Sequence, residues 1–508
     1  MSTKQITELR KAGRLDEALE LATEALAADP ENIWNKRAAA WVYYEHLKKF
    51  VEPGAFEEFK ENLVKIQELQ LPEDEKMVFD RSAWQIGKMV FGLQKQEPVE
   101  HRRLNELFEI VKDFHFTKPS EDYSFLYKAF HGANQNWSGY LEFADWWNFE
   151  NFLPQDGLKE EYAGRQIMAL VEKAYIAYSK KLLEGNALDA FGRQKELDKE
   201  RIQSFLVALD AIIKKHPEYQ YPPFYKAKLM IAIGGDRDET LSSFLPFAKQ
   251  KRNEFWVWEL MAGIFSDDKE TQFDCYCKAL DLKTREDFLV KIRQMFSEML
   301  IERQMYDEAR TEIQKVIAAR ERENWKVPKQ ITQWTEQSWY ASATPKKDNK
   351  ALYAKHSKRA EEILFKDIPE DIVAIEFVNA NKNILNFVKK KGVSGFFKYS
   401  GHLKKPQVGD VLKVRFNGEG KDGFHKIFSA RKAEPNEPCD AIRMYEGSLK
   451  VIPPQNFGFV DDVFIEPRLV QQKELTDGQV LEGKAILTYN KKKSQWGWKA
   501  VSIENVDQ

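Results

Sequence analysis

Three phenylalanines near the C-terminus have the type and spacing needed to bind nucleobases. Phe457 and Phe459 lie two residues apart in a segment that alternates like a β-strand, and Phe464 follows in the next such segment. Side chains two apart in a strand share a face, so Gly458 and Val460 take the other side. If Val460 lies in the core, the rings lie outside it, where stacking on a base contributes about 1 to 3 kcal/mol. We therefore predict a nucleic-acid-binding face here.

Basic and aromatic residues nearby could complete this face. Lysines attract phosphate, and tryptophans offer further stacking platforms. The predicted contributors are Lys450, Lys491, Lys492, Lys493, Trp496 and Trp498. The alternative is that the three phenylalanines pack on a neighbouring domain.

A second mixture of charges and rings precedes this region. Lys389, Lys390 and Lys391 follow Phe387, and Phe396, Phe397 and Tyr399 come downstream. Alternation puts Phe397 and Tyr399 on one face of a strand and Phe396 on the other, so one set must be core. The three lysines form a second predicted nucleic-acid site, with a solvated turn as the alternative.

Patterns typical of catalysis or metal binding are absent from the sequence. The segment 418–421 (GEGK) lacks the Ser or Thr that completes a phosphate-binding loop, and the eight histidines form no His-Glu-x-x-His motif. Cys275 and Cys277, two apart on a predicted helix, face different ways and cannot chelate together. We expect no enzymatic activity, cofactor or metal; an enzyme with a cryptic pocket in the aromatic middle segment is the minor alternative.

The elements that would hold these residues are short strands. From Ile372 onward the apolar period becomes two, which predicts two five-stranded OB-type β-barrels. The predicted strands are 372–378, 384–388, 392–399, 411–416 and 424–430 in the first, and 445–452, 457–460, 462–466, 479–487 and 496–503 in the second. Residues 408–413 align with 476–481, and 395–398 with 462–465, which indicates an internal duplication.

The second barrel resembles a cold-shock domain over most of residues 445–503. The resemblance rests on 446–450 (EGSLK), 457–460 (FGFV), 462–465 (DVFI), 478–480 (GQV) and 500–503 (AVSI). It implies that Phe457, Phe459 and Phe464 stack on successive bases of single-stranded RNA or DNA. Three positions depart from the family pattern: Val451 replaces a Trp, Gln455-Asn456 replace a basic residue, and Glu466 replaces a His, which should weaken binding.

The first 320 or so residues indicate successive helices. Leu15, Ala18, Ala22 and Ala25 recur at helical spacing after Gly13. This arrangement resembles a tetratricopeptide (TPR) repeat, in which small residues sit where paired helices cross. The match is good at the first repeat, fair over 224–319 and poor over 51–215.

The poorly matching stretch is rich in aromatic residues. We interpret it as degenerate helical repeats with an aromatic core; a partner-binding groove is the alternative. The aromatic residues are Phe125, Tyr127, Phe130, Trp137, Tyr140, Phe143, Trp146, Trp147, Phe149 and Phe152.

Composition favours a multidomain intracellular protein. The 508 residues suggest roughly three domains. The net charge of −2 divides into 22 Lys+Arg against 17 Asp+Glu from Asp371 onward, and 56 against 63 before it. Three cysteines, no apolar run of membrane-spanning length and a charged N-terminus without an apolar signal core predict a cytoplasmic location.

Together these patterns predict a multidomain α + β protein. The predicted parts are a TPR-like α-solenoid (1–340, degenerate in 51–215), a basic connector helix (341–370), a first OB-like barrel (371–435) and a second, cold-shock-like OB barrel (440–508). The whole resembles bacterial TPR proteins with C-terminal cold-shock-like modules, some of them associated with conflict or phage-defence operons. The resemblance implies an adaptor whose solenoid binds a protein partner and whose barrels bind RNA or single-stranded DNA, in a bacterial defence or RNA-regulatory system. A pure protein–protein scaffold with degenerate barrels is the alternative.

Overall fold

The computed structural model of the chain describes residues 3–162, 164–186, 196–418, 420, 422–435, 437–454, 456–490 and 493–505. These residues form two compact units. The first comprises Met1–Phe247 and Glu259–Gln272, and the second comprises Ala248–Trp258 and Phe273–Gln508. The predicted domain limits at 340, 370 and 435 stay predictions.

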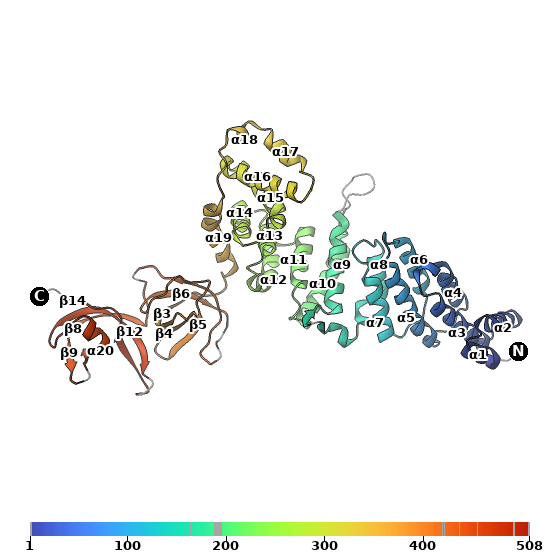
Figure 1. Cartoon of the computed structure of the whole chain (residues 1–508), viewed down its shortest axis with the longest axis horizontal. Helices are drawn as coiled ribbons and strands as arrows, with labels where there is room; N and C mark the ends of the chain where they lie inside the picture. The colour runs from blue at the N-terminus through green and yellow to red at the C-terminus, as the bar shows by residue number, and fades with distance from the viewer. Residues whose placement is uncertain are drawn as a thin grey trace. The chain divides into compact units, whose positions relative to one another are not determined.

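Helices dominate the chain as far as residue 364, as the sequence predicts (Figure 1). The first eight are α1 (Thr3–Lys11), α2 (Leu15–Ala28), α3 (Ile33–Lys49), α4 (Phe56–Glu68), α5 (Lys76–Leu93), α6 (His101–Val111), α7 (Glu121–His131) and α8 (Tyr140–Trp147). The next eight are α9 (Leu170–Leu183), α10 (Lys199–Lys215), α11 (Pro222–Ile233), α12 (Arg237–Gln250), α13 (Phe255–Ile264), α14 (Lys269–Asp281), α15 (Val290–Glu302) and α16 (Tyr306–Arg322).

The first helix pair follows the predicted repeat. Gly13, between α1 and α2, has a φ of 77°, a conformation that glycine adopts without strain. Ala18, Ala22 and Ala25 of α2 are buried, which lets neighbouring helices approach closely. The Asn32 side chain accepts a hydrogen bond from the Trp34 amide at 3.0 Å and caps α3.

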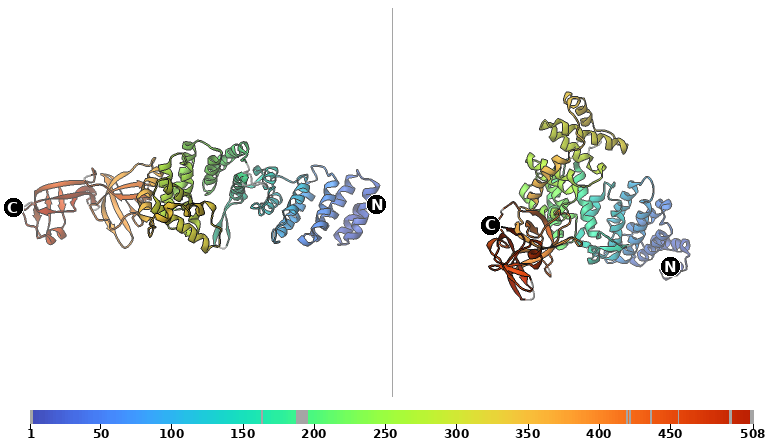
Figure 2. Two further views of the ribbon diagram at one scale, coloured as in Figure 1. Left: turned by 90° about the horizontal axis from the view of Figure 1, so that it is seen from above. Right: turned by 60° about the vertical axis from the view of Figure 1, so that its left-hand side comes forward.

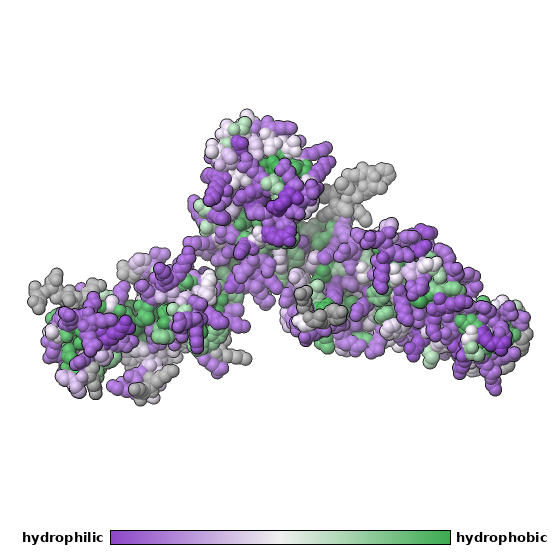
Figure 3. All heavy atoms as spheres, viewed as in Figure 1, coloured by the Kyte–Doolittle hydropathy of each residue, from purple (hydrophilic) through white to green (hydrophobic). Residues whose placement is uncertain are grey.

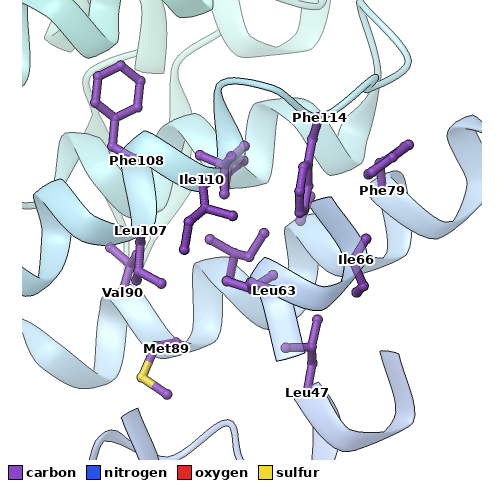
Figure 4. Packing of buried hydrophobic residues seen from close by; sticks show 14 of the residues in the cluster. Leu47, Leu63, Ile66, Phe79, Met89, Val90, Leu107, Phe108, Ile110 and Phe114 are labelled. Atoms are coloured by element: carbon purple, nitrogen blue, oxygen red, sulfur yellow. The ribbon is translucent and has the colours of Figure 1, made fainter. Parts of the chain in front are cut away.

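Successive pairs stack into a solenoid with a continuous core. The odd-numbered helices α1, α3, α5 and α7 pack in order, and Figure 2 shows the helices of this stretch lying side by side. Leu63 of α4, Met89 of α5 and Leu107 of α6 are among the buried side chains that meet between them (Figure 4). Hydrophilic residues predominate on the face of these helices visible in Figure 3, so the apolar faces bury one another.

The aromatic middle segment is mostly core, which confirms that interpretation. Tyr127, Trp137, Tyr140 and Trp147 are among the rings that are completely buried. Their polar atoms are paired: the Tyr127 and Tyr140 hydroxyls lie 2.8 Å apart, and the Trp147 indole donates to a backbone carbonyl at 3.1 Å. Such pairing removes the cost of burying a polar group.

Several short elements were not predicted. Strands β1 (Glu160–Tyr162) and β2 (Arg165–Ile167) form a hairpin within the helical region. Helices α17 (Lys329–Thr335) and α18 (Ser338–Ser342) occupy the stretch where the helical periodicity fades. Elements of three to seven residues span too few turns or alternations to produce a periodic pattern.

The predicted basic connector corresponds to α19 (Lys350–Leu364), which packs as part of the second unit. Its Tyr353, Ala360 and Leu364 are buried. Its Glu361 pairs with Lys278 of α14 at 2.5 Å, and His356 Nδ1 lies 2.5 Å from Asp274 Oδ1. This helix is therefore solvated on one of its faces only.

A buried ion pair joins three helices of this unit. Arg293 of α15 contacts the Glu312 carboxylate of α16, and both side chains are almost inaccessible. Glu312 also accepts hydrogen bonds from the Tyr353 hydroxyl of α19 and, at 2.6 Å, from the Asn349 amide. Burial alone would lower the pKa of Arg293, but Glu312 and Tyr353 hold that pKa above its usual value.

The first β-domain has the predicted five strands. They are β3 (Asp371–Asn379), β4 (Ile384–Lys390), β5 (Val393–Lys398), β6 (Val411–Phe416) and β7 (Ile427–Lys432). Their order is β5-β4-β3-β6-β7, and every pairing is antiparallel. A single parallel bridge between Phe396 and Phe424 brings the two edges together, so the barrel is partly open.

The second β-domain has the same strand order with fuller pairing. Its strands are β8 (Ile442–Ser448), β9 (Lys450–Ile452), β10 (Phe457–Val460), β11 (Val463–Ile465), β12 (Val480–Asn490), β13 (Gln495–Ala500) and β14 (Glu504–Asn505), with helix α20 (Pro467–Gln472) after β11. Strands β8 and β9 are two halves of one bent strand: β8 pairs with β12 and β9 with β10. Strands β11 and β13 pair in parallel.

The two domains do share a plan, but the predicted alignment of the duplication is wrong by one residue. Gly409 and Gly478, rather than Asp410 and Gly478, are equivalent: both have positive φ. Their amides donate at 2.9 and 2.8 Å to the carbonyls of Ile375 and Leu449, at the bends of the first strands. With the same correction of one residue, inward Phe397 is equivalent to inward Ile465, and outward Phe396 is equivalent to outward Phe464.

Candidate nucleic-acid interface

Strand β10 holds two phenylalanines on the outside of the second β-domain. Its residues alternate as predicted: Gly458 and Val460 are buried, while Phe457 and Phe459 are half-buried. A Cβ atom at Gly458 would lie 2.5 Å from Leu449 Cδ1, so any larger residue would require the Leu449 side chain to move. The inward glycine and valine thus turn both rings outward.

Strand β11 adds the third ring. Phe464 lies directly opposite Phe459, between the buried residues Val463 and Ile465. The ring centroids of Phe457, Phe459 and Phe464 are separated by 5.5–5.8 Å. We call these three residues the phenylalanine cluster. The cluster that joins the two β-domains is built from other residues.

A lysine lies at each end of a row that crosses this face. Lys450 of β9 is opposite Phe459, and Lys499 of β13 is opposite Phe464. We call Lys450, Phe459, Phe464 and Lys499 the cross-strand row. Because neighbouring strands are about 4.8 Å apart, the row is about 14 Å long. It places two cations beside aromatic faces, as single-strand binding requires.

One carboxylate reduces the positive charge at the end of this row. Glu466 Oε1 lies 2.6 Å from Lys499 Nζ. A free Glu466 carboxylate would repel phosphate, and the ion pair with Lys499 partly neutralises it. The pair is also partly exposed, so a phosphate can compete for the lysine.

The two tryptophans do not lie in the cross-strand row. Trp498 is opposite Val463, a core residue, so alternation turns it away from the side of Lys499 and Phe464. Its ring packs against both the domain core and the cluster joining the domains, with the Arg443 guanidinium 4.5 Å from its centroid. Trp496 packs against the joining cluster and lies 5.4 Å from the Tyr489 ring. Trp496 and Trp498 thus do not extend the phenylalanine cluster.

The predicted lysines have different surroundings. Lys493 is exposed, and its backbone amide donates to Asn490 Oδ1 at 3.2 Å in the turn after β12. Lys491 and Lys492 lie outside the described residues. Lys389 pairs with Asp371 at 2.7 Å, whereas Lys390 and Lys391 are exposed at the turn between β4 and β5.

The first β-domain resolves the choice between its two sets of rings. Phe387, Phe397 and Tyr399 are buried in its core. Phe396 is half-buried on the outside, 5.6 Å from the Phe424 ring. The outward ring is thus the one equivalent to Phe464.

Phe377 also lies on the outside of the first β-domain, which the sequence pattern does not indicate. Strict alternation would put it on the same side as the core residue Ile375, two positions earlier. A register irregularity between these residues reverses the alternation, and Phe377 is 55% exposed. It lies opposite Asn386, which in turn lies opposite Phe396. Bulges of this kind leave no reliable pattern in sequence.

A separate cavity of about 790 Å³ lies in the first unit. Half-buried Phe149 and Phe152 line it together with Tyr175 and Tyr178. The Tyr178 hydroxyl donates to Asp145 at 2.7 Å, and Arg201 reaches the same carboxylate. The alternative of a groove in the aromatic segment thus has a physical counterpart here.

The described residues contain neither a group of metal ligands nor a membrane-spanning helix. Nowhere in those ranges do three His, Cys, Asp or Glu side chains converge as metal ligands would. Every helix within them is too short or too polar to cross a bilayer.

The structure combines a region of stacked helix pairs with two β-domains that are S1/CSD-like by comparison with protein families. Comparison with protein families matches residues 365–428 to S1/CSD-like domain 1 of the TOTE conflict systems, and residues 443–503 to S1/CSD-like domain 2 of those systems. Residues 220–360 match a domain of unknown function, DUF7017. The match to domain 1 therefore precedes the match to domain 2 along the chain.

Among solved structures, the chain is similar to the crystal structure of the P58(IPK) TPR domain. The identity is 13% and the TM-score 0.21, over 72% of this chain and 97% of that one. None of the curated proteins compared matches the chain.

Proposed function

We propose that this chain is a non-enzymatic adaptor in which the helical solenoid binds a protein partner and the two β-domains bind RNA or single-stranded DNA. The observation that carries this proposal is the phenylalanine cluster. Three half-exposed rings within 5.5–5.8 Å of one another form an apolar surface on the outside of a barrel. Stacked bases cover such a surface, and Lys450 and Lys499 attract the backbone.

The solenoid supports the second half of the proposal. Stacked helix pairs create an extended surface that suits a peptide or a helix of another protein. Within the first unit, the cavity beside Phe149 and Phe152 provides aromatic anchors of the kind that dominate protein interfaces. The similarity to domains of conflict systems supports a role in a bacterial defence system. An RNA-regulatory role and a cytoplasmic location are further parts of the proposal.

Fluorescence anisotropy with labelled RNA and single-stranded DNA tests the nucleic-acid function. The wild type is compared with the Phe457→Ala/Phe459→Ala/Phe464→Ala variant at low and physiological salt. We expect binding that weakens with salt and falls at least about tenfold in the variant, since each stacked base contributes about 1 to 3 kcal/mol. Circular dichroism and the Tm establish that the variant is folded.

The absence of binding by the wild type at low salt would overturn this function. The protein would then be better described as a pure protein–protein scaffold. Met444→Ala is the matched control, because Met444 is an exposed apolar residue of the same domain, on β8.

A further inference from the structure

A groove of about 470 Å³ lies within the second unit, where the two β-domains meet. The first domain contributes Phe377, Asn386 and Phe396, and the second contributes Thr488, Tyr489 and Lys499. The two walls of this groove come from segments about a hundred residues apart, so no local sequence pattern indicates it.

The wall from the first domain is a row that crosses three strands. Phe377 of β3, Asn386 of β4 and Phe396 of β5 lie opposite one another in turn. This row occupies the position in the first domain that Lys450, Phe459 and Phe464 occupy in the second. It presents two outward rings with an amide between them, which suits the faces and the polar edge of a nucleobase.

The wall from the second domain connects the groove with the phenylalanine cluster. Lys499 lines the groove and also lies opposite Phe464 in the cross-strand row. On its other side it lies opposite Ile486, which is buried against the first domain. A strand that follows the cross-strand row therefore reaches the groove at Lys499.

Contacts between the domains hold the two walls in place. Ala374 and Val388 of the first domain pack with Ala441, Ile486 and Leu487 of the second. The Thr488 hydroxyl donates a hydrogen bond to the Glu376 carboxylate. A groove that is already formed requires little reorganisation when a ligand binds.

We infer that this groove is a second base-binding site, and that one single strand of RNA or DNA runs from the phenylalanine cluster past Lys499 into it. Phe377 and Phe396 stack on bases, Asn386 contacts a base edge, and Lys499 holds the phosphate between the two sites. The inference rests on the proposed function, because it extends the same interface.

The exposed rings of the groove favour this occupant. Phe377 is 55% exposed and Tyr489 is 41% exposed, so aromatic surface faces solvent on both walls. Lys499 supplies a cation between them, and stacking combined with one phosphate contact requires no particular base sequence. The carboxylate of Glu376 accepts from Thr488 and can also accept from a base amino group.

A length series tests the inference. Oligo(rU) and oligo(dT) of about 5 and about 15 nucleotides, spanning the usual site sizes of such domains, are titrated against the full chain by anisotropy. We expect the wild type to bind the longer strands more tightly. Phe377→Ala/Phe396→Ala should weaken binding of the long strands about tenfold or more and change binding of the short strands by less than about twofold.

Two further variants guard against misinterpretation. Phe377→Ala alone changes an exposed side chain, so it should fold normally and still lose affinity for long strands. Val393→Ala, at another exposed apolar position on β5, should bind both lengths like the wild type.

The outcomes separate the two claims. Unchanged binding of long strands by folded Phe377→Ala/Phe396→Ala would overturn the groove as a base site and leave the phenylalanine cluster intact. A wild type that binds neither length would overturn the proposed function itself. Loss with RNA alone or DNA alone would identify which single strand occupies the groove.

Discussion

At the scale of single residues, the ring of Phe459 is the centre of the candidate interface. It lies between Lys450 on one neighbouring strand and Phe464 on the other, and 5.8 Å from the Phe457 ring. Its value to a ligand is its flat face, because stacking needs a π-system and is tolerant of base identity.

The effect of a substitution at Phe459 on binding affinity should therefore depend on whether the new side chain has an aromatic ring. Phe459→Leu retains apolar character but loses the ring, and we expect a loss of about 1 to 3 kcal/mol in binding, or roughly 5- to 150-fold. Phe459→Tyr retains the ring and should bind within about threefold of the wild type. Equal losses in both variants, measured by anisotropy, would contradict a stacking role.

His131, in the helical region, has a pKa well below the usual value for histidine. Burial, with a smaller contribution from Lys173, lowers its pKa to about 4. Its Nδ1 lies 2.8 Å from the buried Tyr140 hydroxyl. The unfolded chain, with a histidine pKa of about 6.5, binds this proton more tightly than the folded chain.

Folding stability should consequently fall as the pH drops from about 6.5 to about 4, by up to about 1.4 kcal/mol per pH unit from this residue. His131→Gln cannot take up the proton, so its stability should depend less on pH across that window. Urea unfolding at about pH 7 and about pH 5 checks this. Identical losses in wild type and variant would show that His131 is not responsible.

At the scale of elements, the ion pair between α15 and α16 fixes how α19 packs. Arg293, Glu312 and Tyr353 come from three helices, and Glu312 is completely buried. Removing Arg293 leaves the buried Glu312 charge without its close cationic partner, which is more costly than the pair's own net contribution.

We therefore expect Arg293→Met to destabilise the second unit by about 3 to 5 kcal/mol. The double variant Arg293→Met/Glu312→Leu should recover much of that loss, because no buried charge is left. Denaturant unfolding of the variants and the wild type measures both effects. A single variant as stable as the wild type would contradict the account.

Strand alternation was the most informative sequence pattern at this scale. It correctly assigned Phe457 and Phe459 to one side of β10 and Val460 to the other, because a strand without irregularities has a fixed period of two. The same rule failed at Phe377, where a register irregularity reverses the sides of β3. It also failed to fix the duplication, since the equivalence of Gly409 and Gly478 depends on backbone conformation.

At the scale of the whole molecule, sequence periodicity predicted the succession of helices and strands. The helical period of residues 15–28 and the five strands of the first β-domain agree with the structure, whereas in the second β-domain the first predicted strand is divided into β8 and β9 and the short strand β14 is added. The packing of α19 and the groove between the β-domains could not be predicted, because both depend on contacts between segments far apart in the chain. The residues of the groove can be found in the sequence, but the sequence does not show that they lie close together.

The charge distribution also belongs to this scale. The chain from Asp371 onward has 22 basic and 17 acidic residues, while the preceding part has 56 and 63. The small positive excess around the β-domains favours encounter with a polyanion, and the acidic helical part would repel it. This asymmetry is consistent with separate partners for the two regions.

The most direct test of the central claim is to locate where a bound single strand contacts the chain. Ultraviolet cross-linking of the full chain to oligo(rU) or oligo(dT), followed by mass spectrometry of the peptides, identifies these residues. We predict adducts at the phenylalanine cluster, and with long strands also at Phe377 or Phe396. Adducts confined to the helices, from a protein that binds the oligonucleotide, would contradict the assignment of the β-domains as the nucleic-acid interface.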